Sequence, residues 1–276
     1  MATPEKYPFL HHPCFSELRE ELWARIHLPV ARYCNVKCVF CDHSVGNSCH
    51  TSKPGFASQL MEPEEAISRT MEEIAKNPRL RIVAISGPGE PLFNEGTFAT
   101  FNGVRIRNKN LNFCLSTNGV LLEDTTSILE VLGVSTISVS MSAIFPKTAA
   151  QIYEWAVLDG VRLQGKRMGE ILIKRQLAGI ERAASLGITV KVNSILISNI
   201  NKEEIDQLSE QIAEAGATLQ NIIPLVPIDN GVSLVPPTRE ELDETRQIAS
   251  KNISQFTHCK QCRSDVVGIP GNDRIL

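Results

Sequence analysis

The sequence has 276 residues, with 28 basic and 31 acidic side chains and a formal net charge of −3 at pH 7. Hydrophobic residues make up 42% of it and charged residues 21%, which is ordinary globular usage and argues against disorder. The slightly acidic balance argues against bulk binding to nucleic acid or an anionic membrane. No stretch reaches the roughly 18 apolar residues of a membrane helix, and the first residues lack a signal-peptide pattern. We therefore expect a cytoplasmic protein.

The predicted elements begin with a polar lead-in over residues 1–24 and a strand over 26–31. A loop rich in Gly, Ser and Pro follows over 33–59 and carries four of the cysteines. Residues 62–76 form the first predicted helix, with Pro63 in its first turn and acidic residues at its N-terminus.

Strands and helices alternate from there on. The expected elements are strand 81–86, helix 95–106, strand 111–116, helix 123–132, strand 136–141, an irregular segment 145–167, helix 168–186, strand 189–197, helix 202–215, strand 219–226, and a helix to about 252 that a capping box at Thr238 opens. This alternation predicts parallel strand pairing with right-handed crossovers.

Six such units are too few for a closed eight-fold barrel, so we expect an open, partial (β/α)6 TIM-like barrel over residues 25–235. Residues 1–24 would form an N-terminal extension, and 236–276 a C-terminal helix and tail. Active sites of such barrels lie at the C-terminal ends of the strands. That rule selects the segments Cys34–Cys41, Gly87–Glu90, Ser116–Asn118, Ser140–Ser142 and Asn193–Ser194.

Cysteine usage is unusual for a cytoplasmic chain of this size. A reducing compartment disfavours structural disulfides, so clustered thiols there more often indicate metal or redox chemistry. The eight are Cys14, Cys34, Cys38, Cys41, Cys49, Cys114, Cys259 and Cys262.

The spacing Cys34-x-x-x-Cys38-x-x-Cys41 follows the first strand. Three thiolates can hold three irons of a four-iron, four-sulfur (4Fe–4S) cluster and leave the fourth iron open to a chelating substrate. A structural zinc site is the alternative, but such a site takes four ligands, usually from two short Cys or His motifs that lie close together in the fold. In spacing and position the motif resembles that of the radical S-adenosylmethionine (SAM) superfamily. The resemblance implies that SAM chelates the open iron and is cleaved by one electron to a 5′-deoxyadenosyl radical.

Other strand ends offer candidate SAM contacts. Phe40 matches the aromatic residue that the superfamily places near the adenine, although ordinary core packing would also explain it. The turn Gly87-Pro88-Gly89-Glu90 lies where the superfamily has a glycine-rich turn, which lets backbone carbonyls approach the SAM ammonium. The expected SAM-binding residues are Phe40, Gly87, Gly89, Glu90, Ser116, Asn118 and Asn193.

Five cysteines remain after the triad. Cys259-x-x-Cys262 has a metal-knuckle spacing, and Cys114 lies in a strand near the expected active face. Five thiolates and one histidine give six ligands, enough for two clusters with three ligands each and further open irons. Such clusters would be labile, as a substrate must be.

Longer runs resemble the NifB family of radical SAM proteins, which build the core of the nitrogenase cofactor. The matching runs are His12–Glu17, Arg25–Ala31 with Cys34-Asn35, Gly87–Leu92, Ser116–Gly119, Ile171–Lys174, Val190–Ser194 and Cys259–Asp265. The resemblance implies that two four-iron clusters are fused into an eight-iron cluster with a central carbide. One SAM would donate a methyl group, and a second would supply the radical that abstracts hydrogen from it.

The resemblance also implies three ligand sets and thus three 4Fe–4S clusters. The triad would hold the SAM-binding cluster, and Cys14, Cys259 and Cys262 one precursor cluster. Cys114, also expected to be catalytic, would hold the other precursor together with Cys49 and either His11 or His12. Glu65, on the first helix turn after the loop, is a further candidate oxygen ligand.

Departures from the family pattern are also present. The segment between Cys41 and Cys49 is longer than expected, and Ser140–Ala143 stands where the family tends to have an Asn. The chain resembles the short form without a C-terminal carrier domain, so we expect separate cluster-donor proteins and a downstream carrier or scaffold as partners. Open irons also predict oxygen sensitivity.

Two other functions remain open at this point. A radical SAM enzyme with auxiliary clusters could modify a peptide or small molecule, which would leave the His12-Pro13-Cys14 run unexplained. A non-catalytic iron–sulfur or zinc module would reduce the Gly87–Glu90 turn to ordinary loop chemistry.

Overall fold

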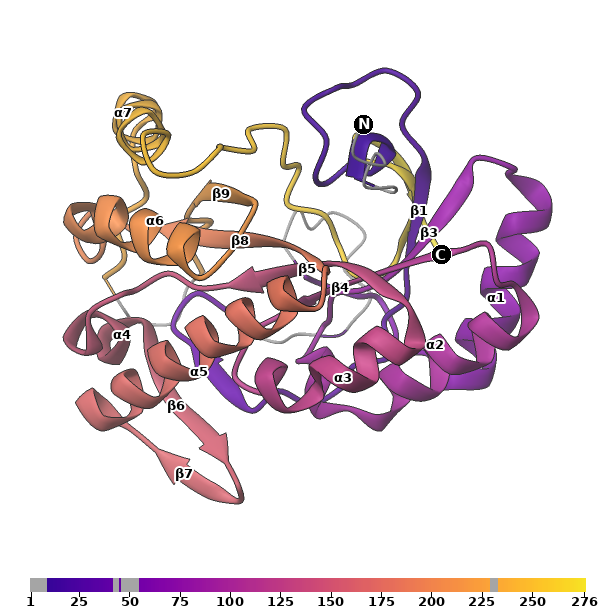
Figure 1. The fold of residues 1–276 in the computed structure, drawn as a ribbon, viewed down its shortest axis with the longest axis horizontal. Coiled ribbons are helices and arrows are strands. Elements are labelled where there is room, and N and C mark those ends of the chain that lie inside the picture. Colours follow the sequence, from indigo (N-terminus) through magenta and orange to yellow (C-terminus); the bar gives the residue numbers. More distant parts are fainter. Residues whose placement is uncertain (1–8, 42–44, 46–54, 229–232) are drawn as a thin grey trace.

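The structure is a computed structural model that describes residues 9–41, 45, 55–228 and 233–276. Six strands lie side by side in chain order and run parallel. They are β1 (Ala24–His27), β3 (Leu80–Ile85), β4 (Asn112–Thr117), β5 (Val134–Ser140), β8 (Thr189–Leu196) and β9 (Leu219–Pro224). The predicted partial TIM-like barrel is thus confirmed (Figure 1).

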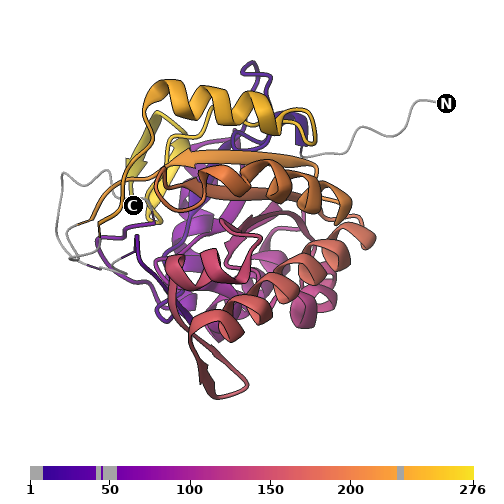
Figure 2. The ribbon, with the colours of Figure 1, turned by 90° about the vertical axis from the view of Figure 1, so that its left-hand side faces the viewer.

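Helices cover the outer face of this sheet (Figures 1 and 2). They are α1 (Pro63–Lys76), α2 (Glu95–Arg107), α3 (Leu122–Leu132), α5 (Gly165–Ser185), α6 (Ile205–Glu214) and α7 (Arg239–Ala249), with 3-10 turns at Phe9–His11, Pro91–Phe93 and Lys202–Glu204. The predicted capping box is present, because Thr238 and Glu241 exchange hydrogen bonds at the start of α7. Among the described residues, no helix is both long and apolar enough to cross a membrane.

The segment 145–167 is not irregular, as predicted, but folded. It forms α4 (Pro146–Ile152) and a hairpin of β6 (Tyr153–Leu158) and β7 (Val161–Leu163). β6 pairs antiparallel with β2 (Val36–Cys38), a strand inside the predicted loop 33–59. The hairpin therefore fixes the backbone at Cys38. The strand predicted over 26–31 is also corrected, since β1 begins at Ala24 and ends at His27.

A second unpredicted hairpin follows the tail cysteines. β10 (Val266–Ile269) pairs antiparallel with β1, and β11 (Asn272–Ile275) pairs with β10, so the sheet continues past the barrel strands. The fully buried Arg25 of β1 joins this hairpin by a 2.8 Å ion pair to Asp273 and a 2.8 Å hydrogen bond to the Gly268 carbonyl. The domain boundaries expected at residues 24 and 235 stay a prediction.

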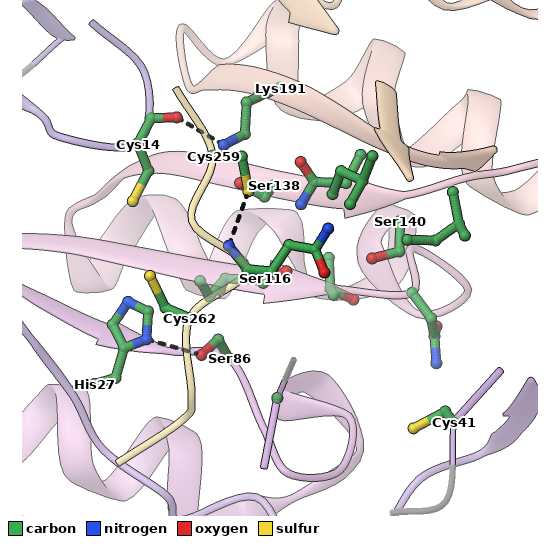
Figure 3. A pocket seen from close by; sticks show the side chains of 18 of the residues that line it. Cys14, His27, Cys41, Ser86, Ser116, Ser138, Ser140, Lys191, Cys259 and Cys262 are labelled. Carbon is green, nitrogen blue, oxygen red and sulfur yellow. Dashed lines mark hydrogen bonds between the residues drawn. The ribbon is translucent and has the colours of Figure 1, made fainter. Parts of the chain in front are cut away.

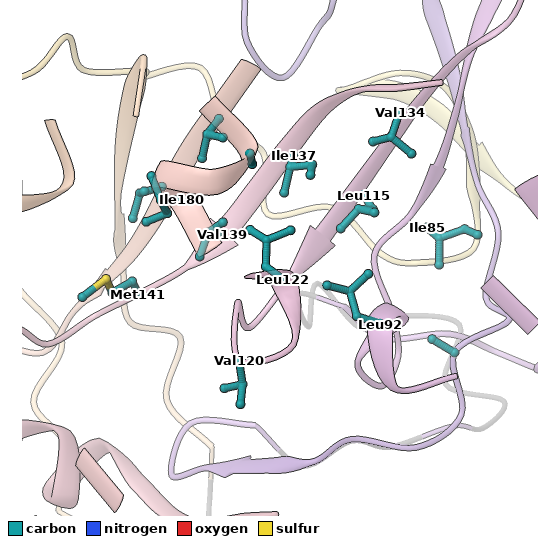
Figure 4. Close-up of a cluster of buried hydrophobic side chains, with 14 of the residues drawn as sticks. Ile85, Leu92, Leu115, Val120, Leu122, Val134, Ile137, Val139, Met141 and Ile180 are labelled. Atoms are coloured by element: carbon teal, nitrogen blue, oxygen red, sulfur yellow. The ribbon is translucent and has the colours of Figure 1, made fainter. Parts of the chain in front are cut away.

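Successive side chains of each barrel strand face alternately toward the helices and toward the barrel interior. Leu115, Ile137 and Val139 pack with Leu122 and Ile180 between sheet and helices (Figure 4). The intervening residues of the same strands, such as Ser116 and Ser138, point to the other face, because successive side chains of a strand alternate. The barrel interior is therefore lined by polar side chains and thiols.

Candidate functional site

A cavity of about 350 Å³ lies at the C-terminal ends of the barrel strands. All seven cysteines of the described residues line it, and none forms a disulfide. They come from the N-terminal segment, the loop after β1, strand β4 and the tail before β10. Cys49, a predicted ligand, lies outside the described residues.

The register of the barrel strands shows which residues lie side by side along the inner wall of the cavity. Cys114 of β4 pairs with Ala84 of β3 and Thr136 of β5. One level higher, Ser116, Ser138 and Lys191 form a row across β4, β5 and β8. Above that, Ser140 pairs with Asn193, which pairs with Asn221 of β9. Of these residues, all but Thr136 and Asn221 line the cavity, with Ala84 and Cys114 on the lowest level.

Cys34, Cys38 and Cys41 form the first thiol group. Burial, and after it the nearby Glu90 and Cys41, raise the pKa of Cys34 to about 12. Burial also raises the pKa of Cys38, with Cys41 and Cys34 as the next causes. The Lys37 ammonium donates a 2.5 Å hydrogen bond to the Cys41 carbonyl and holds the loop against β2. The three thiols are thus close enough to influence one another.

Cys14, Cys259 and Cys262 form the second group, with Cys114 beside it. Burial raises the pKa of Cys262 to about 11; Arg25 opposes this rise, and Cys14 and Cys259 add to it. Burial likewise raises the pKa of Cys114 to about 12, and Cys14 contributes. In Figure 3, Cys14 and Cys262 lie at the opposite end of the view from Cys41.

The structure separates the two candidate histidines. His12 is buried and lines the cavity; its Nδ1 accepts a 3.1 Å hydrogen bond from the Cys14 backbone, and no partner for its Nε2 is found in the described part of the chain. Burial, then the charges of Lys191 and Arg25, lower the pKa of His12 and keep it neutral. His11 instead stacks on Trp23 with ring centres 5.0 Å apart, outside this cavity.

Glu65, the candidate oxygen ligand, is exposed on the first turn of α1 and does not line the cavity. Gly87 is also outside it: a Cβ there would lie 2.7 Å from the Ser264 hydroxyl oxygen. The other predicted SAM residues all line the cavity: Phe40, Gly89, Glu90, Ser116, Asn118 and Asn193.

Glu90 ties the turn after β3 to the end of β4. Its buried carboxylate accepts hydrogen bonds from the Thr117 hydroxyl at 2.5 Å, the Asn118 backbone at 2.6 Å and the Leu92 backbone at 3.0 Å. Burial raises the pKa of Glu90 to about 7, against the effect of these donors. Asn118 in turn donates to Asn35 at 2.8 Å, so Glu90 positions a side chain directly beside the triad loop.

Gly89 permits a close approach of two backbone segments. A Cβ there would lie 2.4 Å from the Tyr33 carbonyl oxygen, while the Gly89 N–H donates a 2.7 Å bond to Ala31. We expect Gly89→Ala to lower the free energy of unfolding by about 1–3 kcal/mol, as overpacking does, and to weaken SAM binding. Gly96→Ala is the control, since its Cβ meets nothing nearer than 3.5 Å. If the two variants had equal free energies of unfolding in urea and bound SAM equally well, Gly89 would have no special role in the fold or in SAM binding.

Sequence reasoning missed two functional candidates in the cavity wall. Lys191 is a charged residue inside the apolar run Val190–Val192, a signal that could have been followed up. His27 of β1 also lines the cavity and lies 3.0 Å, Nδ1 to oxygen, from the Arg263 carbonyl.

His27 gives the cluster-free protein an acid-sensitive stability. Burial, then Arg25, lowers its pKa to about 3, so the folded state stays neutral where the unfolded chain, with the ordinary value of 6.5, takes up a proton. Stability therefore falls as pH drops below 6.5, by up to about 1.4 kcal/mol per pH unit from this residue. The free energy of unfolding should therefore differ between pH 6.5 and pH 5. We expect this difference, measured by urea unfolding, to be smaller in His27→Gln than in the parent protein. An unchanged difference would show that His27 is not the cause.

The donor set fits iron–sulfur clusters. Seven thiols and the unpartnered Nε2 of His12 surround one cavity, and thiolates are the ligands that such clusters use. Within the described ranges, no three His, Cys, Asp or Glu side chains are arranged to hold one metal ion. The glycine at position 89 lets the turn after β3 lie directly against the backbone of Arg32 and Tyr33, just before the triad.

The chain belongs to the radical SAM superfamily, whose family model matches residues 28–212. A crystal structure of a radical SAM methyltransferase from Sphaerobacter thermophilus is similar with a TM-score of 0.59 and 18% identity, over 85% of this chain and 64% of that one. At that identity the likeness shows the fold. Within the superfamily, the chain belongs to the NifB family.

Two curated relatives are similar to this chain, and the second, which the chain covers almost completely, carries the family assignment. The FeMo cofactor biosynthesis protein NifB of Klebsiella pneumoniae is 40% identical over 270 residues, which cover 95% of this chain and 58% of that protein. The protein of the same name from Methanocaldococcus jannaschii is 38% identical over 265 residues, which cover 96% of this chain and 88% of that protein. The chain thus spans little more than half of the first relative and most of the second.

Proposed function

We propose that this chain is a radical SAM enzyme of nitrogenase cofactor biosynthesis that fuses two four-iron clusters into an eight-iron, carbide-containing precursor. One SAM would supply the methyl carbon that becomes the carbide, and a second the 5′-deoxyadenosyl radical. The printed function of the relatives supports the pathway. One observation carries the proposal: seven cysteines in two groups line one cavity, far more than a single SAM-binding cluster needs.

Cys34, Cys38 and Cys41 would hold the resident cluster, which when bound supplies the electron that cleaves SAM. The protein's own part is to shape the SAM pocket. Glu90 holds Asn118 at the edge of the triad loop, and Gly89 lets the turn after β3 approach the Tyr33 backbone beside that loop. With SAM and the clusters bound, the barrel wall would limit the access of bulk water to the reacting carbon and so limit side reactions of a radical.

The two precursor clusters are substrates and would occupy the rest of the cavity. The electrostatic coupling of Cys14 with Cys262 and of Cys262 with Cys259 supports the first ligand set. For the second we assign Cys114 and His12, with Cys49 as a third ligand outside the described residues. His11 and Glu65 are not assigned, because both lie away from the cavity.

The histidine assignment has a direct test. His12→Ala should lower iron retention and product formation at least about tenfold, since loss of a ligand or its close support weakens metal sites by that order. His11→Ala is the matched neighbour and should retain both. The measurement is iron per chain after anaerobic gel filtration, together with product. The reverse ranking would transfer the role to His11.

Product analysis tests the function as a whole. Under anaerobic, reducing conditions with SAM, iron and sulfide, we expect S-adenosylhomocysteine and 5′-deoxyadenosine together, and about 12 irons per chain for three clusters. Labelled methyl carbon should enter the eight-iron product. Deoxyadenosine alone, with conversion of a peptide or small molecule, would support the alternative radical SAM enzyme. Formation of neither SAM product would contradict both.

A further inference from the structure

Lys191 is a buried cation that has no anionic partner among the residues that the structure describes. Its side chain projects from β8 into the cavity wall, and the residue is 3% exposed. Its ammonium donates one 2.6 Å hydrogen bond to the Cys14 carbonyl and lies 4.7 Å and 4.9 Å from the ring centres of Phe15 and Phe256. Within the described residues no carboxylate lies in salt-bridge range of it. Figure 3 shows the contact with Cys14.

These contacts do not offset the burial of a full charge. An ammonium carries three donors, and here one carbonyl and two ring faces face it. Taking an ion out of water costs several kcal/mol unless an opposite charge meets it. Arg25, the other buried cation nearby, illustrates the usual solution, because Asp273 pairs with it at 2.8 Å. Lys191 has the cost of burial without that counter-charge.

The surroundings of Lys191 indicate what could supply the missing negative charge. Its ammonium influences both the Cys114 thiol and His12, and it is bonded to the Cys14 backbone. It therefore lies between the proposed ligands of the two substrate clusters. A 4Fe–4S core of charge 2+ bound by the three thiolates of Cys14, Cys259 and Cys262 carries a net charge of −1. Loading these cysteines would therefore bring an anion to this ammonium, which is bonded to the Cys14 backbone.

We propose that the Lys191 ammonium is the counter-charge that holds an anionic iron–sulfur substrate beside Cys14 and Cys114. The inference rests on the proposed function and names a positioning residue for it. Lys191 draws the incoming cluster to the deep end of the cavity and retains it there. It also makes the loaded cluster easier to reduce, because an adjacent positive charge favours the added electron.

The test compares Lys191→Met, Lys191→Gln and Lys191→Arg in full-length chain whose triad is replaced by Ala, so that retained iron reports the substrate sites alone. Lys166→Met, whose side chain is 74% exposed, removes the same charge elsewhere and is the control. Each protein is melted before and after anaerobic loading with ferrous iron and sulfide. The release of iron to a chelator and the cluster reduction potential are then measured.

Lys191→Met should melt at or above the parent temperature without clusters, since removing an unpaired buried charge does not destabilise a fold. After loading it should gain less in melting temperature, release iron at least about tenfold faster and show a more negative potential, because charge contacts of this kind are worth more than a factor of ten. Lys191→Arg should restore retention, and Lys191→Gln, which keeps a donor but no charge, should not.

Other outcomes would overturn the inference. A lower melting temperature of the unloaded Met variant with unchanged iron retention would make Lys191 a structural support. Rescue by Gln would assign the role to the hydrogen bond rather than the charge. In chain with an intact triad, weaker SAM binding with unchanged iron retention would make the SAM carboxylate the anion. Absence of iron from the parent itself would overturn the proposed function instead.

Discussion

Cys38→Ala should abolish 5′-deoxyadenosine formation and remove about four irons per chain, while the remaining irons stay bound. Cys38 is fixed by β2, which pairs with β6, and its thiol is coupled to those of Cys34 and Cys41. A cluster with two thiolates left would lose its anchoring in the triad loop. Anaerobic iron analysis and chromatography of SAM products measure both effects.

Cys262→Ala is the reciprocal control for that experiment. Cys262 belongs to the second thiol group, so its loss should lower substrate iron but keep SAM cleavage. A melting curve shows whether each variant keeps its fold. Deoxyadenosine formation by Cys38→Ala at the parent rate would exclude radical SAM chemistry at this triad.

Cys114→Ala should show the opposite pattern, with SAM cleavage retained and the eight-iron product lost. Cys114 is 7% exposed and lies on the lowest level of the cavity wall, outside the triad. Removing one buried sulfur should cost only about 1 kcal/mol of stability, so the fold should survive. Product formation is followed by transfer of labelled methyl carbon into cluster, and deoxyadenosine is quantified in the same samples.

Thr136→Val separates chemistry from packing in that experiment. Thr136 lies beside Cys114 in the strand register and is buried, and Val has nearly its shape without a hydroxyl. The Thr136 hydroxyl is a hydrogen-bond partner of the Cys114 thiol, so Thr136→Val should reduce product formation less than Cys114→Ala does. If Thr136→Val blocked product as strongly as Cys114→Ala, the surroundings of Cys114 rather than its sulfur would be the cause. Normal carbide insertion by Cys114→Ala would remove Cys114 from the ligand set.

The barrel was predictable because its information is local. Most helices are amphipathic, as α1 and α6 are, or capped within their own residues, as at Thr238, and a strand such as β3 is a short apolar run between turns. The triad was equally accessible, because three cysteines within eight residues and the strand before them lie in one stretch of chain. The location of Cys114 near the active site could be predicted, because its position along the predicted strand indicates how close it lies to the C-terminal end of the barrel.

The two hairpins were not predicted because their partners are distant in sequence. β6 pairs with a strand more than 100 residues earlier, and β10 pairs with β1 across most of the chain. β10 does end at Pro270-Gly271, a turn dipeptide that could have revealed it. His11 and His12 could not be ranked, since adjacent residues at the end of a short turn point in different directions and only tertiary packing decides which is buried.

The pairing of β1 with β10 imposes an order on biosynthesis. The strands that fix Cys38 are complete once Leu158 has left the ribosome, whereas the group at Cys14 waits for Cys259, Cys262 and β10. Translation at about 5–20 residues per second separates these events by about 5–20 s. During that interval the nascent chain exposes an open sheet edge and unenclosed thiols. Each new molecule therefore passes through a stage at which the strands that hold Cys38 are complete while the group at Cys14 is not yet assembled and its thiol is accessible to a chaperone or an oxidant.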